Sequence, residues 1–250
     1  MLRRLGFAAL LLTTVAAGAL ASPARIGGVP IYLPAPRGFC ELSESNNSDQ
    51  RMITTLGGLL EKSGNKLLGM SADCQQLRDW HSGKRQLLDD YAQYQTPIAS
   101  MDKPPSETVA QTCNTLRDEG NKILANQLPD IKARVESTLS KIKMGEARFL
   151  GVLAEDAGSC YAGLIQKIHT EVGTDKTQIT AFAITTIKNK SVFSYRFSVY
   201  RNPQTVNLVL GKLKADVQAL LVANGAGAQA QAPARNGENP SNSLSSSTQR

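Results

Sequence analysis

The sequence is poor in the side chains on which metal sites depend. It contains two histidines among 250 residues, and neither has a partner at the spacing of an HExxH motif. The four cysteines include no CxxC pair, which argues against a structural zinc site. We therefore expect neither a metal nor a cofactor.

Motifs for nucleophilic catalysis and phosphate binding are missing as well. No GxSxG segment places a serine on a sharp turn between a strand and a helix. The glycines of Gly57-Gly58 and of Gly225-Ala226-Gly227 lack the lysine that accompanies a phosphate-binding loop. Because no catalytic set emerges, a binding role is favoured over an enzymatic one.

Aromatic residues and charge clusters are scarce. Aromatics make up 5% of the sequence, and the formal net charge of +7 at pH 7 is spread along the chain. A surface for single-stranded nucleic acid would need basic and aromatic residues interleaved, so we expect no nucleic-acid partner. The mild positive charge is compatible with an anionic envelope component such as lipid headgroups or cell-wall polymers.

What the chain does contain is an N-terminal segment typical of a cleaved export signal. Arg3 and Arg4 precede an apolar run from Leu5 to Leu20, and Ala19-Leu20-Ala21 has the small residues that a signal peptidase reads. The run is shorter than the ~20 residues that span a bilayer, which favours a signal peptide at 1–21 over an anchor. We expect a bacterial periplasmic or secreted protein with no transmembrane span after cleavage; secretion from a eukaryotic cell is the alternative.

The two ends of the mature chain differ in composition from its middle. Residues 224–250 are rich in Ala, Gly, Gln, Pro, Asn and Ser, and Leu244 is the only large apolar residue there. Such a segment cannot bury enough surface to offset the entropy of ordering it, so we expect a disordered tail. Residues 22–28 are expected to form a loose leader, which leaves one domain at 29–223.

The C-terminal half of this domain predicts a four-strand antiparallel meander. Phe193, Tyr195, Phe197 and Val199 alternate with polar residues, which indicates a strand whose aromatic face is buried. A turn at 188–190 joins this strand to an Ile- and Thr-rich strand at 178–187. Two further strands, at 148–154 and 160–169, flank a Glu-Asp-Ala-Gly turn.

Helices are expected around this sheet, giving an α+β fold. Asn202 and Pro203 predict the start of a closing helix that ends at Asn224-Gly225. Apolar stripes over 109–124 and 128–142 predict two central helices separated by Pro129, because proline ends or kinks a helix. The N-terminal part reads as strand 31–33, helix 47–64, strand 66–72 and an ambiguous segment 87–96 that slightly favours strand.

The cysteines are disulfide candidates, since an exported protein matures in an oxidising compartment. Cys40, Cys74, Cys113 and Cys160 allow three pairings. We favour 40–74, which joins neighbours, with 113–160, which would tie the apolar stripe of a central helix to a strand. The two crossed pairings remain alternatives, as do free buried thiols.

Few titratable residues qualify as catalytic candidates. His81 lies in a polar segment that we expect to be a loop, and His169 ends an expected strand; both are interpreted as exposed surface histidines. The carboxylates of Asp89-Asp90 and Glu155-Asp156 are adjacent in sequence, so a turn or solvated edge explains them better than acid–base catalysis. Three tyrosines could line a ligand pocket on the sheet, although core packing is the commoner role. They are Tyr161, Tyr195 and Tyr200.

The segment Leu33-Pro34-Ala35-Pro36-Arg37-Gly38-Phe39-Cys40-Glu41-Leu42 resembles a group of uncharacterised exported bacterial proteins, which carry a similar Pro-x-Gly-Phe segment after their signal. The expected order of strand, helix, meander and closing helix is similar to that of PsbP-like domains, which are small α+β modules. Members of that group act mostly as accessory or assembly factors, which is what the resemblance implies here. The central helical stretch from 106 to 142 departs from the simple pattern, and no functional residue is carried over.

Three functions follow from these observations. The preferred one is a non-catalytic exported accessory protein that binds an unknown envelope protein or an anionic envelope component. The second is an envelope hydrolase that uses His169 or His81 with nearby carboxylates. The third is a carrier that holds a small apolar or anionic ligand between sheet and helix.

Overall fold

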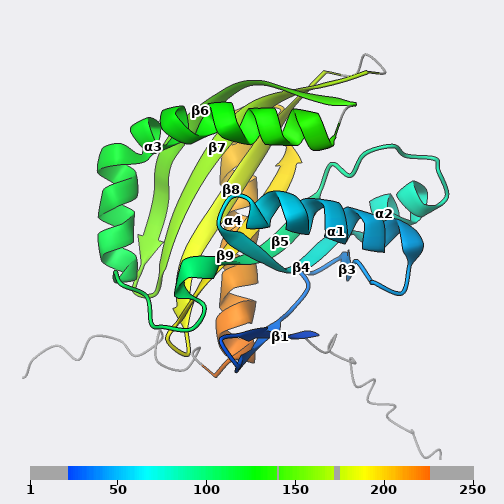
Figure 1. Ribbon diagram of the computed structural model, residues 1–250. Coiled ribbons are helices and arrows are strands. Elements are labelled where there is room, and N and C mark those ends of the chain that lie inside the picture. The colour runs from blue at the N-terminus through cyan, green and yellow to red at the C-terminus, as the bar shows by residue number, and fades with distance from the viewer. Residues whose placement is uncertain (1–21, 140, 172–174, 226–250) are drawn as a thin grey trace, which may run out of the picture.

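The computed structural model describes residues 22–139, 141–171 and 175–225. The expected export signal and the expected tail beyond residue 225 lie outside these residues. The described chain forms a single α+β domain built on a seven-stranded antiparallel sheet, as predicted (Figure 1). The strand order is β3-β4-β5-β9-β8-β7-β6. The strands are β3 (Phe39–Glu41), β4 (Asn65–Asp73), β5 (Tyr91–Pro97), β6 (Ile142–Asp156), β7 (Ser159–Thr170), β8 (Lys176–Ile187) and β9 (Lys190–Val199).

The predicted meander is confirmed as β6 to β9, in which each strand pairs antiparallel with the next. The β8–β9 hairpin turns at Lys188 and Asn189, whose φ angles are 48° and 60°. Positive φ at both central residues gives a turn whose twist matches that of the flanking strands. The ambiguous segment is resolved as strand β5, which pairs with β9 and extends the meander toward β4 and β3.

The segment expected to be a loose leader is instead an ordered strand. β1 (Ser22–Ile26) pairs antiparallel with β2 (Val29–Leu33) in a separate two-stranded sheet. Ile26 is fully buried and packs against Leu220 in the core, so burial of an apolar side chain holds the segment in place. The expected domain boundary also moves at the other end, because the Asn224 side chain exchanges two hydrogen bonds with the backbone of Tyr32.

One face of the sheet is covered by α4 (Pro203–Ala223), the predicted closing helix. The Asn202 side chain accepts a hydrogen bond from the Thr205 amide, and Pro203 occupies the first turn, as its fixed φ favours. Three of the four buried residues of the helix, Val209, Leu213 and Val217, pack against Ile179, Ala181 and Ala183 of β8 and against Tyr161.

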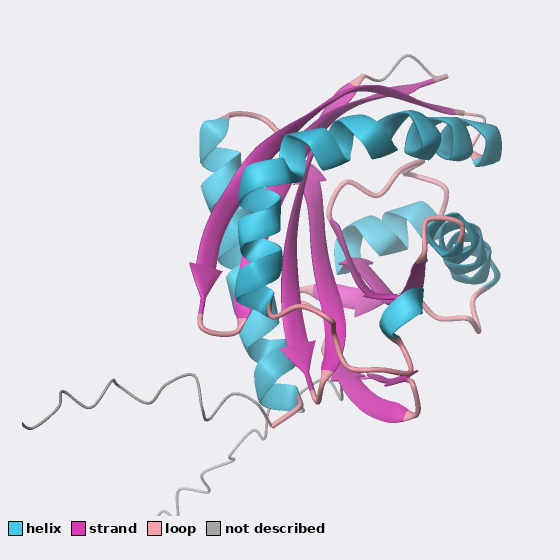
Figure 2. Cartoon of the chain, turned by 60° about the vertical axis from the view of Figure 1, so that its left-hand side comes forward, coloured by secondary structure: helices cyan, strands magenta, loops and turns pink. Residues whose placement is uncertain are grey.

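The opposite face carries α1 (Asn47–Glu61) and α3 (Val109–Thr138) (Figures 1 and 2). The expected pair of central helices is one helix, since α3 runs through Pro129 without ending there. Figure 1 shows that α3 changes direction along its length, so that it has two arms. Leu139 and Ile142, expected on its second stripe, lie beyond it: Leu139 is the C-cap and Ile142 begins β6.

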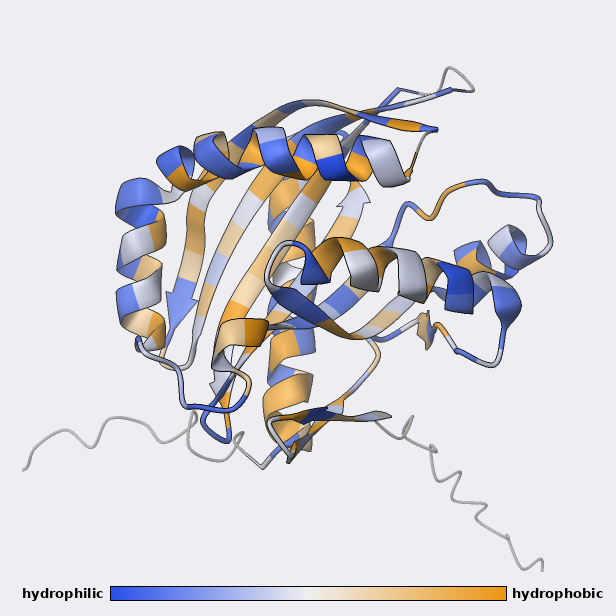
Figure 3. Cartoon of the chain, viewed as in Figure 1, coloured by the Kyte–Doolittle hydropathy of each residue, from blue (hydrophilic) through white to orange (hydrophobic). Residues whose placement is uncertain are grey.

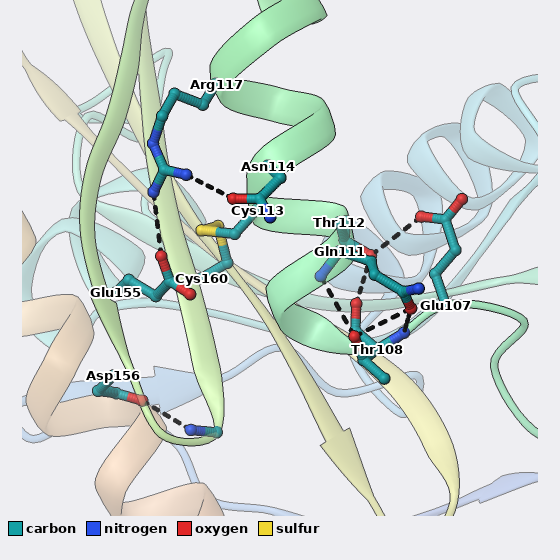
Figure 4. The surroundings of a disulfide bond; sticks show 11 residues. Glu107, Thr108, Gln111, Thr112, Cys113, Asn114, Arg117, Glu155, Asp156 and Cys160 are labelled. Atoms are coloured by element: carbon teal, nitrogen blue, oxygen red, sulfur yellow. Dashed lines mark hydrogen bonds and ion pairs between the residues drawn. A yellow bond between two sulfur atoms is a disulfide. The ribbon is translucent and has the colours of Figure 1, made fainter.

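Both favoured disulfides are confirmed. Cys40 is bonded to Cys74 and Cys113 to Cys160, with Cα–Cα distances of 4.9 and 5.5 Å. The second bond ties the first arm of α3 to β7, and the nearby Arg117 side chain reaches Glu155 of β6 (Figure 4). The sequence did not predict two short helices, α2 (Cys74–His81) and the 3-10 turn η1 (Ile98–Ser100). Among the described helices, none combines the length and the mean hydropathy that a membrane-spanning segment needs.

Candidate functional site

The face of the sheet opposite α4 carries a cavity of about 660 Å³ between the sheet, α1 and α3, which we call the aromatic groove. Its volume lies within the range of ligand sites in proteins. Both arms of α3 and the C-terminal end of α1 form its walls, and strands β5 to β9 form its floor. Figure 3 shows apolar residues on the strands that are visible between α1 and α3.

Four aromatic rings lie next to one another across the floor of the groove. Tyr91 stacks on Phe197 with 4.2 Å between ring centroids, and Tyr195 follows at 6.2 Å from Phe197. Phe182 lies 5.6 Å beyond Tyr195. The register explains this row, since Tyr91 pairs with Phe197, and Tyr195 pairs with Phe182 on its other side. Cross-strand aromatic neighbours of this kind stabilise a sheet face, yet all four side chains remain partly exposed.

The sequence predicted the wrong buried face for β9. The expected inward residues Phe193, Tyr195 and Phe197 are partly exposed, whereas Ser194 and Arg196 are 2% and 6% exposed. The reason is that α4 lies on the polar face and supplies a carboxylate, Asp216, that pairs with the Arg196 guanidinium. The aromatic face is the one that the groove leaves uncovered.

Polar side chains interrupt the apolar floor and are available for hydrogen bonding. Gln93 and Gln95 are 5% and 4% exposed, and Gln95 Nε2 donates to Gln93 Oε1 at 2.9 Å. Gln166 Nε2 is buried and has no hydrogen-bond partner in the described chain. An unpaired buried donor costs about 1–3 kcal/mol, which an acceptor atom of a bound molecule would recover.

Two tyrosine hydroxyls on the floor are strongly desolvated. Burial raises the pKa of Tyr195 to about 12. Burial also raises the pKa of Tyr91 to about 12, although a hydrogen bond from Gln178 opposes the rise. Both phenols are therefore neutral at physiological pH and can act as donors to a ligand.

The position of α3 over the floor depends on one close approach. A Cβ atom on Gly120 would lie 2.2 Å from a ring carbon of Phe149, so only glycine lets this arm pack against β6. The helix begins at a capping box in which the Thr108 side chain accepts from the Gln111 amide (Figure 4). With the Cys113–Cys160 bond, these contacts fix one wall of the groove.

The two histidines lie apart from the groove. His81 is the last residue of α2 rather than part of a loop, and its Nε2 lies 2.5 Å from Asp49 Oδ1, a carboxylate that is 2% exposed. His169 Nδ1 lies 2.8 Å from Asp175 Oδ1; the His169 side chain is 45% exposed and that of Asp175 is 71% exposed. No serine hydroxyl among the described residues is hydrogen-bonded to either ring. The pairs tie α2 to α1 and β7 to β8 without forming a nucleophilic triad.

The adjacent carboxylates are all engaged in structural contacts. Asp89 binds Arg85 and Lys176, and Asp90 accepts from Gln76 and Ser198. Of the second pair, Glu155 binds Arg117, and Asp156 accepts from the Tyr161 hydroxyl. No group of three or more metal-ligating side chains occurs in the described part of the chain.

Of the three tyrosines expected near a pocket, the structure places only Tyr195 in the groove. Tyr161 is 2% exposed, and both it and Tyr200 pack on the α4 side of the sheet. Sequence analysis missed the glutamines of β5 and β7. The only signal for them in the sequence is that polar Gln93 and Gln95 alternate with other positions of the strand. That both faces of this strand are covered is known only from the fold.

Comparisons with known proteins identify no family for this chain. No family model matches the chain, and no curated protein matches it significantly. Among solved structures, the Ran-binding protein Mog1p of Saccharomyces cerevisiae aligns with 83% of this chain and 94% of its own, at 9% identity and a TM-score of 0.30. A Mog1 point mutant aligns with 82% of this chain and 93% of its own, at 11% identity and a TM-score of 0.35. These scores are too low to support any inference about fold or function.

Proposed function

We propose that this protein is an exported accessory protein without catalytic activity, and that it binds an envelope partner in the aromatic groove. The partner is an envelope protein or an anionic envelope component, and the compartment is periplasmic or extracellular. This role agrees with the one implied by the resemblance to PsbP-like modules.

The partly exposed ring row is the observation that carries the proposal. A sheet face with four aromatic side chains is normally covered by a helix, because burying each ring contributes substantially to stability. Here α1 and α3 stand at the sides of a cavity of about 660 Å³ instead of closing over it. Buried amide and hydroxyl groups between the rings supply the few directed contacts that a specific site needs.

The two disulfides support the proposed compartment. All four cysteines are paired, and Cys113 and Cys160 are fully buried. Structural disulfides persist in oxidising compartments and are rare in the cytosol. They agree with the leader at 1–21, whose removal would leave a chain that begins at Ser22.

The hydrolase alternative receives less support from the geometry. Neither histidine lines the groove, and each is paired with one carboxylate and no described serine hydroxyl. Covalent hydrolysis would need a nucleophile within hydrogen-bonding reach of the histidine, and neither pair has one among the described serine hydroxyls.

Affinity isolation with the full chain tests the proposal. Gln127→Phe places a ring at the groove rim from an exposed helix position, and it should abolish capture of the partner from the envelope fraction. Lys122→Phe, at an exposed position on the same helix outside the groove, is the matched control and should leave capture unchanged. The intact mass of this protein, isolated together with its partner, should correspond to a chain that begins at Ser22. Thiol titration of the same sample should detect no free thiol. Equal capture by the two variants, or a cytosolic product with reduced cysteines, would contradict the proposal.

A further inference from the structure

A second cavity, the apolar pocket, lies beside the aromatic groove. It has a volume of about 380 Å³ and shares Leu56 and Tyr91 with the groove. Its walls come from α1, α2, β4, the segment before β5, the start of β5, the ends of β6 and β7, and the start of β8. The apolar side chains that define it include Met52, Leu56, Met70, Trp80, Leu88 and Ile168. Methionine side chains adapt their shape, which suits a site for a hydrocarbon chain.

The charged residues of this pocket are all cationic. Among the described residues that line it, Arg51 and Lys176 carry charge and none is acidic. Arg51 donates to Ser48 Oγ and forms no ion pair with a described carboxylate. Lys176 shares the single carboxylate of Asp89 with Arg85, at 2.9 and 2.6 Å. Arg51 and Lys176 therefore give the lining of the pocket a positive charge that an anion would complement.

We propose that the apolar pocket binds the hydrocarbon chain of an anionic amphiphile, whose carboxylate or phosphate lies at Arg51 and Lys176. The chain would replace water along the methionine and leucine walls, and each buried methylene would tighten binding about fourfold. The head group would remain at the mouth, where exposed Arg51 contacts it while still hydrated. This ligand is separate from the partner of the aromatic groove, so either site can operate if the other does not.

The protein carries its own reporter for this test. Trp80 is the only tryptophan in the chain, it lines the pocket, and it is partly exposed. A hydrocarbon chain that enters the pocket moves the Trp80 indole from water to an apolar environment, and this shifts the fluorescence emission of Trp80 to shorter wavelength. The two anionic probes are dodecanoic acid and monododecyl phosphate, each below its critical micelle concentration. Dodecanol is the control with an uncharged head group, and acetate and inorganic phosphate are the controls without a hydrocarbon chain.

We expect a saturable shift with at least one of the two anionic probes, and the tighter one identifies the head group. Dodecanol should bind at least about fivefold more weakly, and acetate and phosphate should produce no shift. Extending the chain of the tighter probe should increase affinity and then reach a plateau when the pocket is full.

Three variants locate the site. Arg51→Glu should weaken the anionic probes at least about fivefold without weakening dodecanol, whereas Lys122→Glu, the charge-matched control on α3, should change nothing. Thr55→Phe fills the pocket and should abolish the shift with every chain. Gln127→Phe should leave the shift intact, which separates this proposal from that for the groove. No saturable shift in the wild-type protein, equal affinity for dodecanol, or equal effects of Arg51→Glu and Lys122→Glu would overturn the proposal.

Discussion

Arg196 of β9 and Asp216 of α4 form an ion pair between the sheet and its covering helix. Their side chains are 7% and 11% exposed, so both charges are almost wholly removed from water. The Arg196 guanidinium also lies 4.5 Å from the ring centroid of Phe39. This pair allows the polar face of β9 to be the buried one and turns the aromatic face toward the groove.

Removing the carboxylate should be costly because it leaves a buried guanidinium without its partner. Asp216→Ala should lower the free energy of unfolding by about 3–5 kcal/mol, measured by urea denaturation. The control is Glu146→Ala, which removes the exposed pair with Lys167 and should cost about 0–1 kcal/mol. Equal losses in the two variants would show that Arg196 does not depend on Asp216.

Two helical glycines should respond to alanine with opposite signs. Gly120→Ala gains up to about 1 kcal/mol of helix propensity, but its methyl group would overlap Phe149, so we expect a net loss of about 1–3 kcal/mol. Gly211→Ala in α4 meets no atom within 4 Å and should stabilise the protein. Thermal or urea denaturation of both variants decides the matter; a stabilised Gly120→Ala would mean that α3 does not pack closely on β6.

The two disulfides should contribute similarly to stability, but only the Cys113–Cys160 bond should hold a wall of the groove in place. They join residues 34 and 47 positions apart, so the loss of either should cost about 2–5 kcal/mol. Replacing both Cys113 and Cys160 with serine should also speed amide hydrogen exchange in the first arm of α3. Replacing Cys40 and Cys74 should leave exchange in α3 unchanged, and faster exchange there in both double variants would contradict a local role for the 113–160 bond.

Acidification should weaken the contact between the segment before β5 and β8. Burial alone would raise the pKa of Asp89, but hydrogen bonds and charges from Lys176 and Arg85 outweigh burial and hold it below its usual value of 3.8. Because the folded-state pKa is the lower one, the ionised carboxylate stabilises the fold above about pH 4. This contribution is lost as the pH falls through the folded-state pKa.

The variant Asp89→Asn isolates this effect from the other carboxylates. The free energy of unfolding of the wild-type protein should fall more steeply below about pH 4 than that of the variant. Parallel pH profiles would show that Lys176 and Arg85 do not favour the ionised form.

Local features carried most of the successful sequence predictions. The meander followed from alternation and from the Lys188-Asn189 turn, and the last helix followed from Asn202 and Pro203, because these signals act within a few residues. The favoured disulfide pairing followed from the closeness of Cys40 and Cys74 in the sequence, and the apolar position of Cys113 on its helix supported the second bond.

Features that depend on distant partners were not predictable in this way. Which face of β9 is buried depends on Asp216, twenty residues later, and β1 is ordered because Ile26 reaches a core shared with Leu220. The burial of Gln93 and Gln95 likewise depends on elements that are distant in the sequence. The candidate site could therefore be anticipated only as a possible pocket on the sheet lined by Tyr161, Tyr195 and Tyr200, of which Tyr195 alone lines the groove.

Site-specific photo-crosslinking in intact cells of the source organism tests the central claim most directly. A photoreactive residue at position 127, on the groove rim, should give one discrete crosslinked product in the envelope fraction, and the same residue at position 122 should give none. The same products from both positions, or none from position 127 while the exported protein is folded and oxidised, would contradict binding in the aromatic groove.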